Sequence, residues 1–164
     1  MSMKPAIMLY LIFFSKFLFP CTCEDTLSVQ ESYKISNYIF SGRVIKIEAQ
    51  EINIDGTTYY ADEFKVTFAV DTVFKGKQEA FIEVFSEIQN CGFIFDINRN
   101  YLVYAYSDYK KTPLLEYQLN NPSSKQSEYN LKNIKKVLCT DMCTRTKRMH
   151  EASYDLSILK KFTK

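Results

Sequence analysis

The residues best placed to do chemistry are two cysteines separated by a single threonine, Cys21-Thr22-Cys23. They follow residues 1–20, which are apolar, aromatic and almost uncharged. If the chain is cut before Cys21, the new N-terminus carries a free α-amine beside the carbonyl oxygen of the same residue. These two groups together can take the open coordination position of a metal ion. The pair therefore predicts an N-terminus that can bind a metal.

Residues 1–20 have the organisation of a secretory leader. Lys4 supplies the positive end, and residues 5–19 are mostly Ile, Leu, Met and Phe. The run is interrupted by Lys16 and is short of the ~20 residues that a transmembrane helix needs. We therefore expect a signal peptide over residues 1–20, a mature domain over residues 21–164 and a secreted, extracellular protein. A retained leader or a lipidated Cys21 is the alternative, and either would hold the chain at a membrane.

The charge balance changes when the leader is removed. The whole chain has 21 Lys and Arg against 19 Asp and Glu. Two of the lysines lie in residues 1–20, so 19 basic and 19 acidic residues remain. A chain with no net charge lacks the basic field that attracts nucleic acid. We therefore expect no nucleic-acid partner.

All five cysteines lie beyond the leader, at Cys21, Cys23, Cys91, Cys139 and Cys143. An exported chain meets an oxidising compartment in which disulfides persist. Four of the cysteines are therefore expected to pair and one to be left over. The alternative is a structural zinc site that uses the two closely spaced pairs or His150, but the C-x-C and C-x3-C spacings fit such sites poorly.

The middle of the chain has the pattern of successive short β-strands. β-Branched and aromatic residues dominate 38–49, and Gly42 within that run predicts a bulge or a bend. Apolar and polar residues alternate from Phe64 to Val70, as in a half-buried strand. Asp55-Gly56 and Lys75-Gly76 predict turns. The five expected strands cover residues 38–49, 64–70, 80–85, 92–95 and 101–106.

Helices are expected on both sides of these strands. Ser28, followed three residues later by Glu31, is a capping-box signal for a short helix within 26–35. Apolar residues recur at helical spacing in 146–162. Residues 120–133 are polar and predict an exposed loop. Because closing a sheet removes its exposed edges, we expect a mainly β fold, a five-stranded OB-type antiparallel barrel with flanking N-terminal and C-terminal helices.

Five short motifs occur in order along residues 21–105. They are Cys21-Thr22-Cys23, Ser41-Gly42-Arg43-Val44, Val73-Phe74-Lys75-Gly76, Asn90-Cys91-Gly92 and Tyr101-Leu102-Val103-Tyr104-Ala105. A tail beginning Cys143-Thr144-Arg145-Thr146 leads into the expected C-terminal helix. This ordered set, directly after a leader, resembles the tissue inhibitors of metalloproteinases (TIMP) and, more broadly, netrin-like (NTR) domains, in a short single-domain form.

The resemblance implies a set of disulfides and a mechanism. It pairs Cys21 with Cys91 and Cys23 with Cys143, although Cys139 could equally replace Cys143. It implies a zinc metalloprotease as the protein partner, whose catalytic zinc is chelated in trans by the amine and carbonyl of Cys21. No cofactor of the chain's own is expected.

The resemblance also implies a surface that contacts the protease. The Thr22 side chain would enter the main specificity pocket of the target, and the Cys21–Cys91 bridge would bring residues 88–90 alongside the N-terminus. The implied contact residues are Cys21, Thr22, Cys23, Glu24, Ile88, Gln89 and Asn90.

Netrin-like modules can also use such cysteines only as a scaffold, since a fold does not decide function. The alternative function is therefore a non-inhibitory extracellular module that binds other proteins. An enzyme is not expected, because His150 is the only histidine and has no Ser or Cys partner at motif spacing. We expect His150 to have a surface or capping role.

Overall fold

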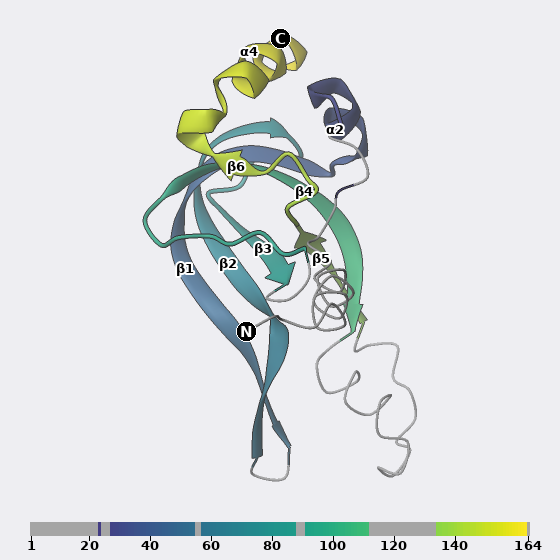
Figure 1. Ribbon diagram of the computed structural model, residues 1–164, viewed down its shortest axis with the longest axis vertical. Coiled ribbons are helices and arrows are strands. Elements are labelled where there is room, and N and C mark those ends of the chain that lie inside the picture. The colour runs from purple at the N-terminus through teal and green to yellow at the C-terminus, as the bar shows by residue number, and fades with distance from the viewer. Residues whose placement is uncertain (1–22, 24–26, 55–56, 88–90, 112–133, 164) are drawn as a thin grey trace, which may run out of the picture.

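A computed structural model describes residues 23, 27–54, 57–87, 91–111 and 134–163 of the 164-residue chain. Within these ranges the chain is mainly β, as expected, and has two α-helices. Figure 1 shows the helices together at one end and the β1–β2 hairpin extending toward the other. The elements are α2 (Val29–Ile35), β1 (Tyr38–Ile54), β2 (Thr57–Lys75), β3 (Phe81–Glu87), β4 (Asn100–Lys111), β5 (Ile134–Cys139), β6 (Lys147–Arg148), the 3-10 turn η3 (Met149–Glu151) and α4 (Ser153–Phe162).

The strands of the described ranges close on themselves in a ring. Their order is β1-β2-β3-β5-β4, and β4 returns to pair with β1, while the two-residue β6 adds to β4 outside the ring. The neighbours β1–β2, β2–β3, β4–β5 and β1–β4 are antiparallel. The β3–β5 pairing is parallel, so the expectation of a wholly antiparallel arrangement is wrong at this junction.

The predicted irregularity at Gly42 is confirmed. The β1–β2 register shifts between Ser41 and Gly42, as a β-bulge does. A Cβ atom on residue 42 would lie 2.7 Å from the carbonyl oxygen of Ala69, so only glycine lets the two backbones approach this closely. The bulge bends a strand that is long enough to pair with both β2 and β4.

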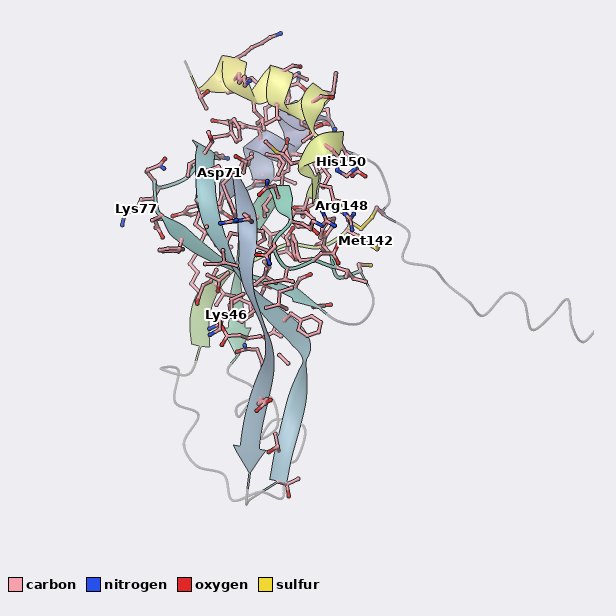
Figure 2. All side chains as sticks on the ribbon, turned by 90° about the vertical axis from the view of Figure 1, so that its left-hand side faces the viewer. Lys46, Asp71, Lys77, Met142, Arg148 and His150 are labelled. Atoms are coloured by element: carbon pink, nitrogen blue, oxygen red, sulfur yellow. A yellow bond between two sulfur atoms is a disulfide. The ribbon has the colours of Figure 1, made fainter. Side chains whose placement is uncertain are left out.

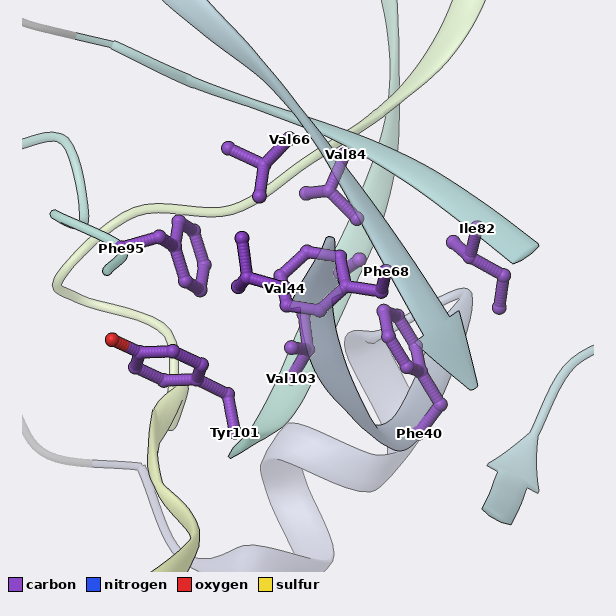
Figure 3. Close-up of a cluster of buried hydrophobic side chains, with 10 residues drawn as sticks. Phe40, Val44, Val66, Phe68, Ile82, Val84, Phe95, Tyr101 and Val103 are labelled. Carbon is purple, nitrogen blue, oxygen red and sulfur yellow. The ribbon is translucent and has the colours of Figure 1, made fainter. Parts of the chain in front are cut away.

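Alternation along the strands produces two separate cores. Phe40 and Val44 of β1 and Val103 of β4 point into the ring, where they meet side chains of β2 and β3 (Figure 3). Ile39 and Leu102, one residue away on the same strands, point to the opposite face and pack under the helices. Because successive side chains of a strand face opposite ways, one pair of strands supplies both cores.

The helices cover the outer core. Ser28 caps α2 through the expected capping box, in which its hydroxyl accepts from the Glu31 N–H and the Glu31 carboxylate accepts from the Ser28 N–H. The Ser28 hydroxyl also donates to the Glu31 carboxylate, and this bond together with the one from the Ser28 N–H lowers the pKa of Glu31. The C-terminal helix begins later than expected, at Ser153, because residues 147–151 form β6 and η3. Ala152 and Leu159 are fully buried against the sheet, as their helical spacing predicted.

Two sequence expectations for strands are wrong. Residues 92–95 are not a strand; only Gly92 makes an isolated bridge, with Asp141. The backbone N–H and C=O of Phe93 bond instead to the hydroxyl of Ser86. The strand that completes the ring is β5, which the sequence interpretation missed. The expected loop over residues 120–133 lies outside the described ranges.

Candidate functional site

A disulfide joins the N-terminal segment to the C-terminal part of the chain. Cys23 and Cys143 are bonded, with their Cα atoms 5.2 Å apart and 120 residues between them in sequence. This is the pairing that the resemblance put first. Cys139, the alternative partner of Cys23, is instead a buried thiol at the end of β5. Closing a loop of this length stabilises the fold by about 5 kcal/mol in the chain-entropy model.

Cys143 is held in a rigid turn by Asp141. The Oδ1 atom of Asp141 accepts from the N–H groups of Cys143 and Thr144, both at 2.8 Å. The Thr144 hydroxyl donates back to the Asp141 carbonyl at 2.7 Å. The Tyr106 hydroxyl donates to Asp141 Oδ2 at 3.2 Å, and burial together with that carboxylate raises the pKa of Tyr106. The turn therefore fixes the point at which Cys23 is attached.

Cys91 lies beside this turn and is itself in a disulfide. The Met142 N–H donates to the Cys91 carbonyl at 2.7 Å, and Gly92 bridges to Asp141. Residues 91–92 and 141–143 thus run next to each other. Cys91 and Cys143 belong to two different disulfides, and both therefore lie in one local structure. Met142 is half exposed at this place. Figure 2 shows it on the same side of the molecule as Arg148 and His150.

The predicted site residues divide into two groups. Cys23, Cys91 and Cys143 are described, and the structure brings their backbones together at the 141–143 turn. The proposed zinc ligand and most of the proposed contact residues lie outside the described ranges. These are Cys21, Thr22, Glu24, Ile88, Gln89 and Asn90.

A second attachment of the N-terminal segment was not expected from the sequence. Arg145, two residues after Cys143, donates from NH1 to the Leu27 carbonyl at 2.7 Å. Its other nitrogens form a bidentate pair with Asp155 of α4, at 2.9 and 2.8 Å. Asp155 is 1% exposed and also accepts from the Tyr104 hydroxyl and the Lys147 ammonium. No sequence motif links these residues, because the contacts span up to 118 positions.

The electrostatics of this cluster favour the ionised pair. Burial raises the pKa of Asp155, but the hydrogen bonds from Arg145, Lys147 and Tyr104 outweigh it and hold that pKa below its usual value. The bond to Asp155 raises the pKa of Arg145. Burial and the neighbouring carboxylate raise the pKa of Tyr104, which therefore stays a hydrogen-bond donor.

Two cavities flank the 141–145 turn. One of about 270 Å³ lies between α2, β4 and the turn, and Leu27, Tyr104 and Arg145 are among its lining residues. The other, of about 140 Å³, is more polar and is lined by Glu87, Asp108 and Asp141 among others. The hydrogen bonds given above already engage Arg145 and Asp141.

The alternative of a structural zinc site finds no support in the described ranges. Cys23 and Cys143 are consumed by their disulfide, and the side chain of His150 is 72% exposed, 3.6 Å from Glu151. No cluster of three or more His, Cys, Asp or Glu side chains there could hold a metal ion. The surface position expected for His150 is confirmed.

No helix in the described part of the chain is long and apolar enough to cross a bilayer. The chain matches no protein-family model, and no curated protein is significantly similar to it.

Proposed function

We propose that this chain is a secreted inhibitor of zinc metalloendopeptidases. The observation that carries the proposal is the Cys23–Cys143 disulfide, which attaches the segment directly after Cys21-Thr22 to a rigid turn. Cys91, at the end of the other proposed contact segment, lies beside the same turn. The mechanism that the resemblance implies requires an N-terminus that is anchored by cysteines and lies next to residues 88–90.

We further propose that the ring of strands is an OB-type barrel. Five strands that close on one another, with α2 before the first of them and α4 after the last, are consistent with that architecture. The barrel would act as a rigid base, because a binding segment that is already ordered loses little entropy when it docks.

The proposed chemistry needs only the first mature residue. The α-amine and carbonyl oxygen of Cys21 would together occupy the open position of the protease's zinc and displace the nucleophilic water. The zinc exchanges its bound water for these two ligand atoms, and no covalent bond in the target is cut. Thr22 would fill the main specificity pocket, and Glu24 with residues 88–90 would complete the contact surface.

The test compares two forms of the protein. One begins at Cys21, and the other carries one additional alanine before it; circular dichroism and the unfolding midpoint establish that both are folded. We expect the first form to inhibit a zinc endopeptidase and the extended form to lose at least about 100-fold in affinity, since its amine can no longer reach the metal. Equal inhibition by both forms would refute zinc chelation.

A different result distinguishes the other candidate. If the form beginning at Cys21 inhibits no member of a broad panel of zinc endopeptidases, the non-inhibitory extracellular module becomes the better assignment. The intact mass and N-terminal sequence of the exported protein establish which form exists naturally. A retained leader or a lipidated Cys21 would exclude the chelating amine.

A further inference from the structure

The N-terminal segment is fixed at two points to one short stretch of chain. Cys23 is bonded to Cys143, and the Leu27 carbonyl accepts a hydrogen bond from Arg145. Cys23 and Leu27 are four residues apart in the sequence, and Cys143 and Arg145 are two residues apart. A disulfide alone leaves rotation about its own bonds, and a second attachment at Leu27 restricts that rotation on the C-terminal side of Cys23.

Arg145 is suited to this second attachment because its guanidinium is itself held. Two of its nitrogens face the two carboxylate oxygens of Asp155, which leaves NH1 directed at Leu27. A planar guanidinium in a bidentate pair has one orientation, which a lysine ammonium does not have. Asp155 lies in the first turn of α4 and is fully buried, so the C-terminal helix determines where the guanidinium points.

The buried carboxylate does not depend on Arg145 alone. Tyr104 donates to Asp155 Oδ2 at 2.9 Å, and Lys147 donates to Oδ1 at 3.1 Å. Loss of the guanidinium therefore leaves Asp155 with a hydrogen-bond donor on each oxygen and a neighbouring positive charge. The contact that would be lost without replacement is the one to Leu27.

We propose that Arg145 and Asp155 are positioning residues for the inhibitory N-terminus. The inference rests on the proposed function. Through this pair, α4 holds the chain at Leu27, four residues after the Cys23–Cys143 disulfide, although neither residue belongs to the proposed protease contacts. Preorganisation of this kind increases affinity by reducing the entropy lost on docking.

The test uses two substitutions and a matched control. Arg145→Met removes the guanidinium, and Arg145→Lys keeps the charge beside Asp155 but cannot form the bidentate pair and reach Leu27 together. Arg148→Met is the control, because it also removes an arginine charge, three residues further along the chain. The Arg148 side chain is half exposed and pairs with Asp96, which is half exposed as well. Hydrogen exchange is measured for residues 27–32 and for β4. Inhibition is measured as Ki, with the active fraction obtained by titration against the protease.

We expect both Arg145 variants to exchange faster at residues 27–32 while β4 is unchanged, and to raise Ki by about 10- to 100-fold with the active fraction intact. The Arg148→Met protein should match the wild type. A merely structural role would lower the active fraction and leave Ki as it was, which would overturn the proposal. Unchanged exchange at residues 27–32, or faster exchange with an unchanged Ki, would also overturn it.

The exchange measurement separates this inference from the proposed function. If the wild type inhibits no zinc endopeptidase, the proposed function fails, yet exchange still reports whether Arg145 fixes residues 27–32. If the wild type inhibits and the Arg145 variants inhibit equally well, the proposed function stands and the positioning role fails.

Discussion

Gly92 lies against the backbone of Glu87, so closely that a Cβ atom on residue 92 would stand 1.6 Å from the Glu87 carbonyl oxygen. Glu87 ends β3, and Gly92 bridges to Asp141. The two ends of the 88–91 connection are thus fixed next to each other. This contact determines where Cys91 lies relative to the Cys143 turn.

The substitution Gly92→Ala should therefore destabilise the protein. The obstacle is backbone rather than a flexible side chain, so the strands themselves must shift, at a cost of at least about 1–3 kcal/mol. The free energy of unfolding in urea measures the loss. Ile94→Ala is the control, because it lies two residues after Gly92 and its side chain is 85% exposed. If the two variants were equally stable, the Glu87 contact would not constrain the fold.

The Asp155 cluster predicts a stability difference that depends on pH. The pKa of Asp155 is depressed in the folded state. The stability that its negative charge contributes is therefore present above the unfolded-state pKa of about 3.9 and is lost as pH falls through the folded-state pKa. Asp155→Asn should lower the free energy of unfolding by about 2–3 kcal/mol at pH 7. This is less than the loss of a partner costs in a fully buried ion pair, because the side chains of Arg145 and Lys147 reach solvent. Between about pH 4 and pH 2 the difference from wild type should narrow.

Urea unfolding across this pH range tests the prediction. Asp96→Asn is the control, since Asp96 is half exposed and pairs with the exposed Arg148. Its stability should stay within about 0.5 kcal/mol of the wild type at every pH. A constant difference for Asp155→Asn from pH 7 to pH 2 would mean that the carboxylate charge does not matter.

Removing the N-terminal disulfide should lower stability and leave the ring of strands in place. The double substitution Cys23→Ser/Cys143→Ser releases a 120-residue loop, for an expected loss of about 2–5 kcal/mol. The unfolding midpoint without reductant measures it. Cys139→Ala provides the comparison, because it alters a buried cysteine and keeps the loop closed. A double variant as stable as the wild type would contradict the prediction.

The proposed zinc chelation predicts that inhibition weakens as pH falls. A zinc ligand must be the neutral amine, and an unperturbed α-amine has a pKa of about 7.7–8. Ki should therefore rise as pH is lowered from 8 to 6. A small hydroxamate inhibitor measured on the same protease corrects for the enzyme's own titration. A corrected Ki that does not vary over this range would argue against coordination by the amine of Cys21.

Local features of the sequence predicted local structure well. The Ser28–Glu31 capping box, the bulge at Gly42 and the end of β2 at Lys75 depend on residues close together in the chain, and the structure has all three. Gly76 follows β2 with a φ of 106°, a conformation that favours glycine. The turn at Asp141 is also a local feature. An aspartate is a typical turn signal, so Asp141, two residues before Cys143, could have predicted this turn.

Contacts between distant segments could not be predicted in this way. The apolar residues of 92–95 predict a strand, whereas the backbone of Phe93 bonds to the side chain of Ser86. Consecutive lysines at 135 and 136 obscured β5, which is a strand because β4 lies alongside it. Tyr104, Arg145 and Asp155 come from three distant parts of the chain, and the closed ring with α4 packed on it brings them together. Propensity is a weak guide where tertiary pairing decides.

The parallel junction between β3 and β5 consists of one residue pair, Phe85 and Cys139, with one further hydrogen bond from Thr140 N–H to the Phe85 carbonyl. A closed circle of strands separates first at its weakest link, and every other neighbouring pair in this circle is longer. Cys139 and Thr140 directly precede the turn that holds Cys143. Opening of this link would therefore act first on the residues next to the Cys143 turn, whose position on the sheet would then depend on the Tyr106–Cys139 pairing and the Tyr106–Asp141 hydrogen bond.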